Sequence, residues 1–217
     1  MRLQFLSDVH LEYRYAIPVL KPAASYLALL GDIGNPFQAN YSSFLQQASQ
    51  KFDKVFLISG NHEYLYNNVQ QTDNRISDVC SNLPNVYYLN NRSIEIDNII
   101  VLGTTLWTLN HPLHQKSVNF IKDNLSTQES LSTGINRKRI VLTHHLPSYQ
   151  LILPQFSKYS YIYDRYASHL DYLIQKPIAA WLCGHSHCKL DMHINGVYCG
   201  INANWKGDLQ VRIAEIQ

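Results

Sequence analysis

Five short polar segments in this 217-residue sequence carry residue types that bind metals, and six of the ten histidines lie in them. Each segment follows a run of apolar residues. Carboxylates, an amide oxygen and imidazoles together are ligands for first-row transition metals, so the pattern indicates metal chemistry. The segments are Asp8-Val9-His10, Gly31-Asp32, Gly60-Asn61-His62-Glu63, His144-His145 and Gly184-His185-Ser186-His187.

The apolar runs before these segments predict the strands that position them, at residues 2–7, 26–30, 54–59, 138–142 and 178–183. In a layered α/β fold, the loops beyond the carboxyl ends of strands converge on one crevice. Glycines at 31, 60 and 184 are expected to let the backbone turn sharply before each polar loop. The donors expected to converge are Asp8, His10, Asp32, Asn61, His144, His185 and His187.

Seven donors are too many for one first-row ion and suit two. Mixed carboxylate and imidazole ligands favour Mn²⁺, Fe, Zn²⁺ or Ni²⁺ over Ca²⁺, which prefers oxygen alone. A bridging carboxylate would hold two ions about 3.5–4 Å apart, the spacing used for in-line phosphoryl displacement. The positive charge of two divalent ions exceeds the negative charge of two aspartates and a bridging hydroxide, so the net charge of the centre stays positive. The sequence therefore predicts attraction of a phosphate ester.

Net charge, hydropathy and cysteine content argue against several other classes of function. The formal net charge is only +2, which argues against broad electrostatic binding to nucleic acid or an acidic membrane. The first residues show no apolar run of signal-peptide length, and no stretch approaches the ~18 apolar residues of a membrane span. Because the sequence shows no sign of export, the four cysteines, which form no CxxC pair, are expected to be reduced. We therefore predict a cytoplasmic protein that does not bind a membrane.

Outside the polar segments, no linker marks a boundary, so we predict a single domain over residues 1–217. Residues 104–137, with a predicted helix at 115–131, form either a lid or substrate-selecting insertion, or a surface helix with polar loops. A second helix is predicted at 160–174. Its face of Tyr159, Tyr163, Tyr166 and Leu170 is expected to pack against the sheet, although an aromatic wall that stacks a nucleotide base is the alternative.

The remaining patterns complete an α/β layered arrangement. Helices are predicted at 41–52 and 65–83, and strands at 86–89, 93–96, 99–102 and 209–213. Asn195-Gly196 favours a type I′ turn between strands at 192–194 and 197–200.

In their order, the segments DVH, GDIG, GNHE, THH and GHSH resemble the motif set of the calcineurin-like metallophosphoesterases, over residues 8 to 187. SDVHLEY, TLWT at 105–108 and YASHLDYLI add likeness to a compact bacterial-type branch. The resemblance implies a four-layer α/β/β/α sandwich with mixed sheets. It also implies hydrolysis of phosphate mono- or diesters, with a water or hydroxide that bridges two metal ions as the nucleophile.

The resemblance further implies roles for individual residues. Asp32 would bridge the ions, His62 would touch the substrate phosphate or leaving group, Glu63 would support the site, and His145 would contact substrate or pack. The first ion would take Asp8, His10, Asp32 and His187, and the second Asp32, Asn61, His144 and His185.

Mn²⁺ is the ion expected first, with Fe, Zn, Ni or Co as alternatives. A small phosphate ester is the expected substrate, while a phosphodiesterase or nuclease shares the same metal chemistry. No protein partner is evident. A non-catalytic scaffold would have lost ligands, and none of the seven is missing.

Overall fold

The computed structural model describes residues 1–126, 137–205 and 207–216, and two β-sheets form its centre. The first sheet has the strand order β11-β1-β2-β3-β4 and the second the order β5-β6-β7-β8-β10-β9. The first is built from β1 (Arg2–Leu6), β2 (Tyr26–Leu30), β3 (Lys54–Ile58), β4 (Val86–Tyr88) and β11 (Ile213–Glu215). The second is built from β5 (Arg92–Ile96), β6 (Ile99–Thr104), β7 (Lys138–Thr143), β8 (Ile178–Cys183), β9 (Lys189–Ile194) and β10 (Val197–Asn202).

Both sheets are mixed, as predicted. β1, β2, β3 and β4 are parallel, and β11 joins β1 antiparallel, which brings the two ends of the chain together. In the second sheet β6, β7, β8 and β10 are parallel, and β5 and β9 are antiparallel edges. The predicted hairpin across Asn195-Gly196 is therefore confirmed as β9–β10.

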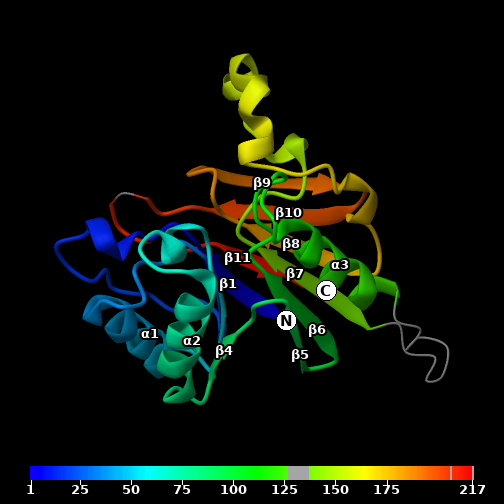
Figure 1. Ribbon diagram of the computed structural model, residues 1–217. Coiled ribbons are helices and arrows are strands. Elements are labelled where there is room, and N and C mark those ends of the chain that lie inside the picture. Colours follow the sequence, from blue (N-terminus) through cyan, green and yellow to red (C-terminus); the bar gives the residue numbers. More distant parts are fainter. Residues whose placement is uncertain (127–136, 206, 217) are drawn as a thin grey trace.

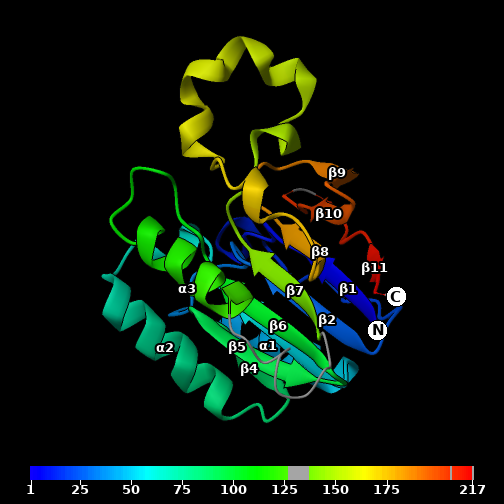
Figure 2. The same ribbon diagram turned by 90° about the vertical axis from the view of Figure 1, so that its right-hand side faces the viewer.

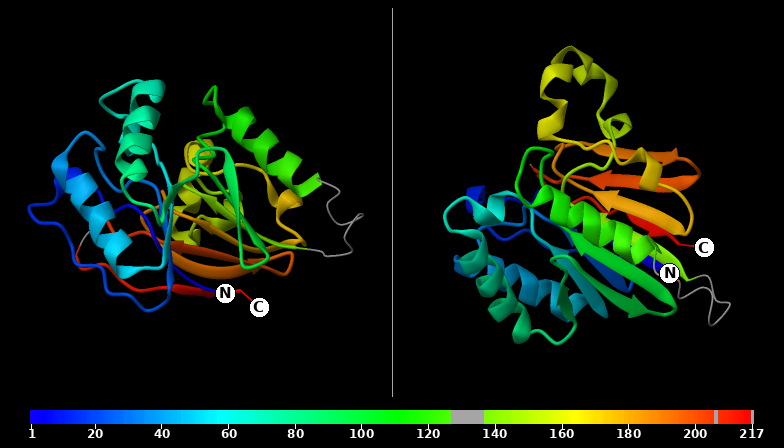
Figure 3. Two further views of the ribbon diagram at one scale, coloured as in Figure 1. Left: turned by 90° about the horizontal axis from the view of Figure 1, so that it is seen from below. Right: turned by 45° about the vertical axis from the view of Figure 1, so that its right-hand side comes forward.

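Helices cover the outer faces of the two stacked sheets, which confirms the four-layer sandwich. α1 (Ala39–Lys51) and α2 (Val69–Ser81) lie on one side of the molecule and α3 (His114–Ser126) on the other (Figures 1 and 3). Val118 and Ile121 of α3 are buried in the outer cluster of the second sheet. The idea that 104–137 selects substrate stays a prediction, and its residues 127–136 lie outside the described part of the chain.

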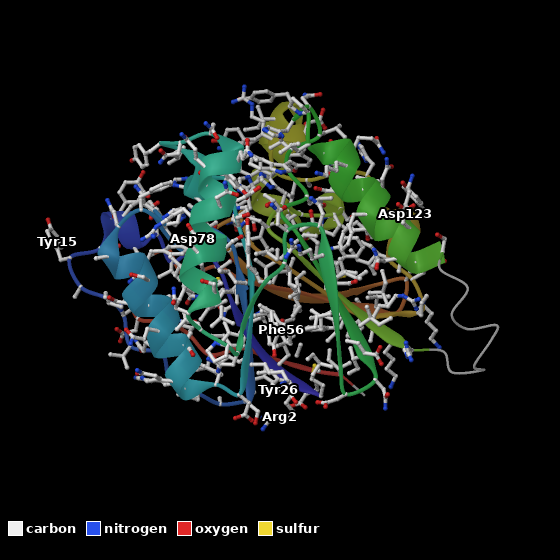
Figure 4. All side chains as sticks on the ribbon, turned by 60° about the horizontal axis from the view of Figure 1, so that its bottom comes forward. Arg2, Tyr15, Tyr26, Phe56, Asp78 and Asp123 are labelled. Carbon is white, nitrogen blue, oxygen red and sulfur yellow. The ribbon has the colours of Figure 1, made fainter. Side chains whose placement is uncertain are left out.

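Strands β2 and β3 are buried on both faces because each contributes to two cores. Leu27 and Leu29 pack with α1 and α2, whereas Ala28 and Leu30, the alternate residues, lie in the core between the sheets. Figure 4 shows Phe56 of β3 in the interior, in contrast to Tyr15 on a peripheral loop. Continuous apolar runs thus end in polar loops at one edge of the sandwich.

Three element predictions differ from the structure. The helix predicted from 65 begins at Val69, because the Asn68 side chain accepts a hydrogen bond from the Gln71 backbone N–H and caps it. The last strand is shorter and later than 209–213, since only Ile213–Glu215 pairs with β1.

The helix predicted at 160–174 is wrong. A 3₁₀ segment, Pro154–Arg165, bends at Tyr159 and is followed by a short 3₁₀ turn at Asp171–Leu173. None of the residues of Pro154–Arg165 is buried, so no sheet face supplies the packing that an α-helix of this length needs. The segment, yellow in Figures 1 and 2, rises away from both sheets as an arch.

Candidate metal centre

The predicted donors lie together at the carboxyl ends of five parallel strands. Asp8, Asp32 and Asn61 follow β1, β2 and β3 of the first sheet, while His144 and the His185–His187 segment follow β7 and β8 of the second. The two stacked sheets therefore contribute to one site. Asp8, His10, Asp32 and His144 are buried, whereas the His187 side chain is 40% exposed.

Ligand atoms come within 4.8 Å of one another in three groups among the described residues. The groups are Asp8, His10 and His187; His10, Asp32 and His62; and Asp32, His144 and His185. His10 and Asp32 each belong to two groups, so the three form one continuous cluster. This is an arrangement that can hold more than one cation.

Asp8 provides a test of whether these residues fit a cation. One carboxylate oxygen, Oδ2, accepts hydrogen bonds from the Ser7 hydroxyl and from the backbone N–H of His185 (3.1 Å). The other, Oδ1, is buried without a hydrogen-bond partner and lies 3.4 Å from His187 Nε2. A buried, unpaired carboxylate oxygen is costly unless a cation meets it, so the donor set fits a metal ion here.

Asp32 lies between the two halves of the cluster. Its Oδ1 accepts the backbone N–H of His62 at 2.7 Å, while Oδ2 is 3.2 Å from His144 Nε2 and 3.8 Å from His10 Nε2. Burial raises the pKa of Asp32, but His144 and the other histidines outweigh burial and hold this pKa far below its usual range. Asp32 is thus an anion, and its Oδ2 atom faces His144 on one side and His10 on the other.

The two adjacent histidines have different surroundings. His144 Nδ1 donates to the Leu30 carbonyl at 2.8 Å, which directs Nε2 toward Asp32 and toward Asn61 Oδ1 at 3.1 Å. Burial lowers the pKa of His144, yet Asp32 more than compensates and raises it to about 9. His145 donates from Nδ1 to the Thr105 carbonyl, belongs to none of the three groups, and has a pKa that burial and His185 lower.

Glu63 connects the loops after β2 and β3. Its buried carboxylate accepts the backbone N–H groups of Asp32 (3.0 Å), Ile33 (2.7 Å) and Gly60 (2.7 Å). Burial, followed by the charge of Asp32, raises the pKa of Glu63 to about 7. This geometry suits a supporting carboxylate that positions its neighbours.

Glu12 is a second supporting carboxylate and is not among the site residues predicted from the sequence. Glu12 Oε1 lies 3.0 Å from His10 Nδ1 and 3.1 Å from His62 Nδ1. Burial raises the pKa of Glu12, but these two hydrogen bonds lower it to about 2 overall. The available signal was its position two residues after His10. Trp205 was also missed: its ring stacks on His187 at 4.9 Å between centroids.

Five of the seven predicted donors have a strained backbone. Asp8, His10, Asp32, His185 and His187 have φ angles of 49° to 65°, which is uncommon for non-glycine residues. Such strain persists only where the surrounding structure enforces it, and it is concentrated at functional sites in proteins.

The three glycines serve two purposes. Gly31 turns the chain with a φ of 83°, as predicted. Gly60 and Gly184 have no positive φ, and the lack of a side chain lets neighbouring residues come close to their backbone. A Cβ on Gly60 would lie 2.2 Å from Asp32 Oδ1, and a Cβ on Gly184 would lie 2.6 Å from the Ser7 Cβ.

A cavity of about 370 Å³ opens above the cluster. One side, which we call the ligand wall, consists of Asp32, Asn61, His62, His185 and His187. The opposite side comes from residues 152–166, which we call the aromatic arm. Tyr159, Tyr163 and Tyr166 line this cavity, so the expectation that they pack against the sheet is wrong.

Comparisons with known proteins agree with the site. Residues 1–189 match the family described as calcineurin-like phosphoesterase. An uncharacterised protein of Acanthamoeba polyphaga mimivirus is 31% identical over 252 residues, with 92% of this chain and 89% of that protein covered.

Two solved structures show the same fold at low identity. Phosphopantetheinyl hydrolase from Mycobacterium tuberculosis has a TM-score of 0.61 and 14% identity, with 98% of this chain and 95% of that chain covered. A protein from Thermus thermophilus has a TM-score of 0.67 and 11% identity, over 100% of this chain and 99% of that one. Within the described residues, no helix has the length and apolarity that crossing a membrane requires.

Proposed function

This chain belongs to the calcineurin-like phosphoesterase family of metal-dependent phosphoester hydrolases, and we propose that it hydrolyses small phosphate esters with two divalent transition-metal ions. The observation that carries the proposal is the position of Asp32. Its Oδ2 atom lies between His10 and His144, and no group of donors contains both of these histidines. A shared carboxylate at this point suits a pair of ions.

The donors divide naturally between two ions. Asp8, His10, Asp32 and His187 would hold one, and Asp32, Asn61, His144 and His185 the other. When bound, the ions would polarise the phosphoryl oxygens and make a water acidic enough to attack phosphorus in line. Imidazole and carboxylate ligands suit Mn²⁺, the ion we would test first, and also Fe, Zn, Ni and Co.

The chain's own residues would orient and protonate the substrate. His62 lines the cavity with its side chain 23% exposed, and its Nδ1 donates to Glu12. Burial lowers the pKa of His62, but Glu12 and Asp32 raise it above its usual value overall. His62 would therefore carry the proton that the departing alkoxide needs, while Glu63 holds Asp32 and Gly60 in place.

A small monoester is favoured over nucleic acid because the cavity is compact. None of the described residues lining it is lysine or arginine, although proteins commonly use these residues to bind a nucleic-acid backbone.

The cysteines at 80, 183, 188 and 199 are all free, which fits the predicted reducing, cytoplasmic location.

The test combines elemental analysis with a substrate comparison. We expect about two ions per chain after dialysis against Mn²⁺, and faster turnover of para-nitrophenyl phosphate than of bis-para-nitrophenyl phosphate. One ion or none in the folded protein would contradict the dinuclear proposal. Preference for the bis ester, cyclic nucleotides or oligonucleotides would assign a phosphodiesterase or nuclease instead.

A further inference from the structure

The aromatic arm presents apolar side chains that the fold itself does not bury. A 3₁₀ helix has three residues per turn, so side chains three positions apart lie on one side of it. Phe156, at 39% exposed, is a large apolar residue with no core to enter. The arm residues that face the cavity include Leu153, Phe156, Tyr159, Ile162, Tyr163 and Tyr166.

The charged residues of the arm, Lys158, Asp164 and Arg165, are not among the residues that line the cavity. The Lys158 amino group lies 4.9 Å from the centroid of the Tyr159 ring, and the Asp164 carboxylate accepts a hydrogen bond from Tyr149. Neither residue lines the cavity, and no described lysine or arginine does. A second charged group of a substrate, placed against the arm, would therefore have no lysine or arginine partner among the described lining residues, and burying an unpaired charge is unfavourable.

The base of the arm is fastened to the metal centre. The backbone N–H of Leu146 donates to the Tyr166 carbonyl at 3.0 Å, and that of Ser168 donates to the Leu146 carbonyl at 2.9 Å. His185 Nε2 donates to the Arg165 carbonyl at 3.1 Å, since a carbonyl only accepts. This bond leaves His185 Nδ1 as the ring atom able to bind a cation. These bonds place the base of the arm, next to Tyr166, beside the ligand wall.

From this geometry we infer the substrate class: a phosphate monoester whose alcohol carries an aromatic ring. The phosphate sits on the ligand wall, and the ring packs against Phe156, Tyr159 and Tyr163. A cavity of about 370 Å³ has the size of a small-molecule pocket. The inference rests on the proposed function, and it excludes substrates with a chain of further phosphates.

Two esters with equally basic leaving groups test the inference. 2-(1-Naphthyl)ethyl phosphate and ethyl phosphate both release a primary alkoxide, so their kcat/KM values differ mainly through the ring. Burial of the ring predicts about a 10–100-fold preference for the naphthyl ester. Phe156→Ala/Tyr163→Ala should reduce this ratio to a few-fold. Tyr161→Ala, on the same arm but 79% exposed and outside the cavity lining, should leave the ratio unchanged.

Binding of the non-hydrolysable 2-(1-naphthyl)ethylphosphonate provides a readout that does not need turnover. Calorimetry on the metal-loaded protein should give a Kd at least about tenfold lower than that of ethylphosphonate, and the double variant should reduce the difference to a few-fold. Absence of turnover on both esters would overturn the proposed function, and the phosphonates would still decide the role of the arm. Turnover of both esters at equal rates, with equal phosphonate affinities, would overturn the aromatic substrate class alone.

Discussion

The two sides of the cavity are stabilised in opposite ways. The ligand wall rests on strand ends, with Asp32 and His144 buried and Glu63 accepting backbone N–H groups from two loops. The 3₁₀ segment Pro154–Arg165 of the aromatic arm has no buried residue and is attached mainly through backbone hydrogen bonds at its base. The residues proposed to bind the metal ions thus lie on the sandwich, whereas those proposed to contact the alcohol lie on a segment outside its cores.

This contrast predicts which changes are tolerated. A residue on the ligand wall is coupled to several others, so its loss should alter metal binding, catalysis and stability together. An exposed residue on the arm, such as Phe156, should chiefly alter selectivity, because it is not part of any core.

The largest expected effect is that of Asp32→Asn. The amide oxygen can still accept the His62 backbone N–H, but the amide NH₂ that replaces Oδ2 cannot bind a cation between His10 and His144. We expect metal analysis to show loss of both ions. Turnover should fall by more than the ~10²–10³-fold that one transition-state hydrogen-bond donor contributes.

Asp78→Asn is the matched control, since Asp78 is an exposed residue of α2 (Figure 4). It should keep both ions and full activity. If Asp32→Asn retained two ions, Asp32 would not be the shared ligand, and the division of donors proposed above would be wrong.

The adjacent histidines provide the second test. His144→Ala should lower metal content and abolish turnover, because Nε2 lies beside both Asp32 and Asn61. His145→Ala should leave metal content near normal, since His145 belongs to none of the three groups of donors. Elemental analysis of both variants checks this. The reverse result would show that the ligand has been misassigned by one residue.

His62→Ala should keep both ions but affect substrates unequally. A positioned histidine acid contributes ~10²–10⁴-fold when the leaving group needs a proton. Para-nitrophenolate leaves without one, whereas ethoxide does not, so kcat should fall far more for ethyl phosphate than for para-nitrophenyl phosphate. Equal losses would indicate that His62 positions the phosphate, and loss of metal would make it a structural part of the centre.

The difference between the two sides also explains what the sequence could predict. A buried strand such as Tyr26–Leu30 is a continuous apolar run in the sequence, and the polar residue that follows it lies at the site. The position of Asp32 could therefore be predicted from its immediate sequence neighbours. The spacing of two residues between His10 and Glu12 was a signal for their contact, whereas the contact of Glu12 with His62 depends on how two loops approach each other and follows from no spacing.

The structure of the aromatic arm differs from the predicted helix for a related reason. Tyr159, Tyr163 and Tyr166 have the spacing of an α-helical face, but periodicity predicts a helix only where a surface is available to bury that face. Here the chain leaves the sheets, forms 3₁₀ turns and directs these rings into the cavity. Only Leu170, the fourth residue of the supposed face, enters the core.

The smallest expected effect compares one substitution at two places. Phe44→Ala, at a fully buried position of α1, should lower the free energy of unfolding by about 3–5 kcal/mol. Phe156→Ala should change it by less than about 0.5 kcal/mol, because the side chain is 39% exposed and fills no core space. Urea unfolding of the two variants measures both values. A loss above about 1 kcal/mol for Phe156→Ala would mean that the arm folds over its own apolar residues in solution. The cavity would then be closed before substrate arrives, and an aromatic ligand would have to displace the Phe156 side chain in order to bind.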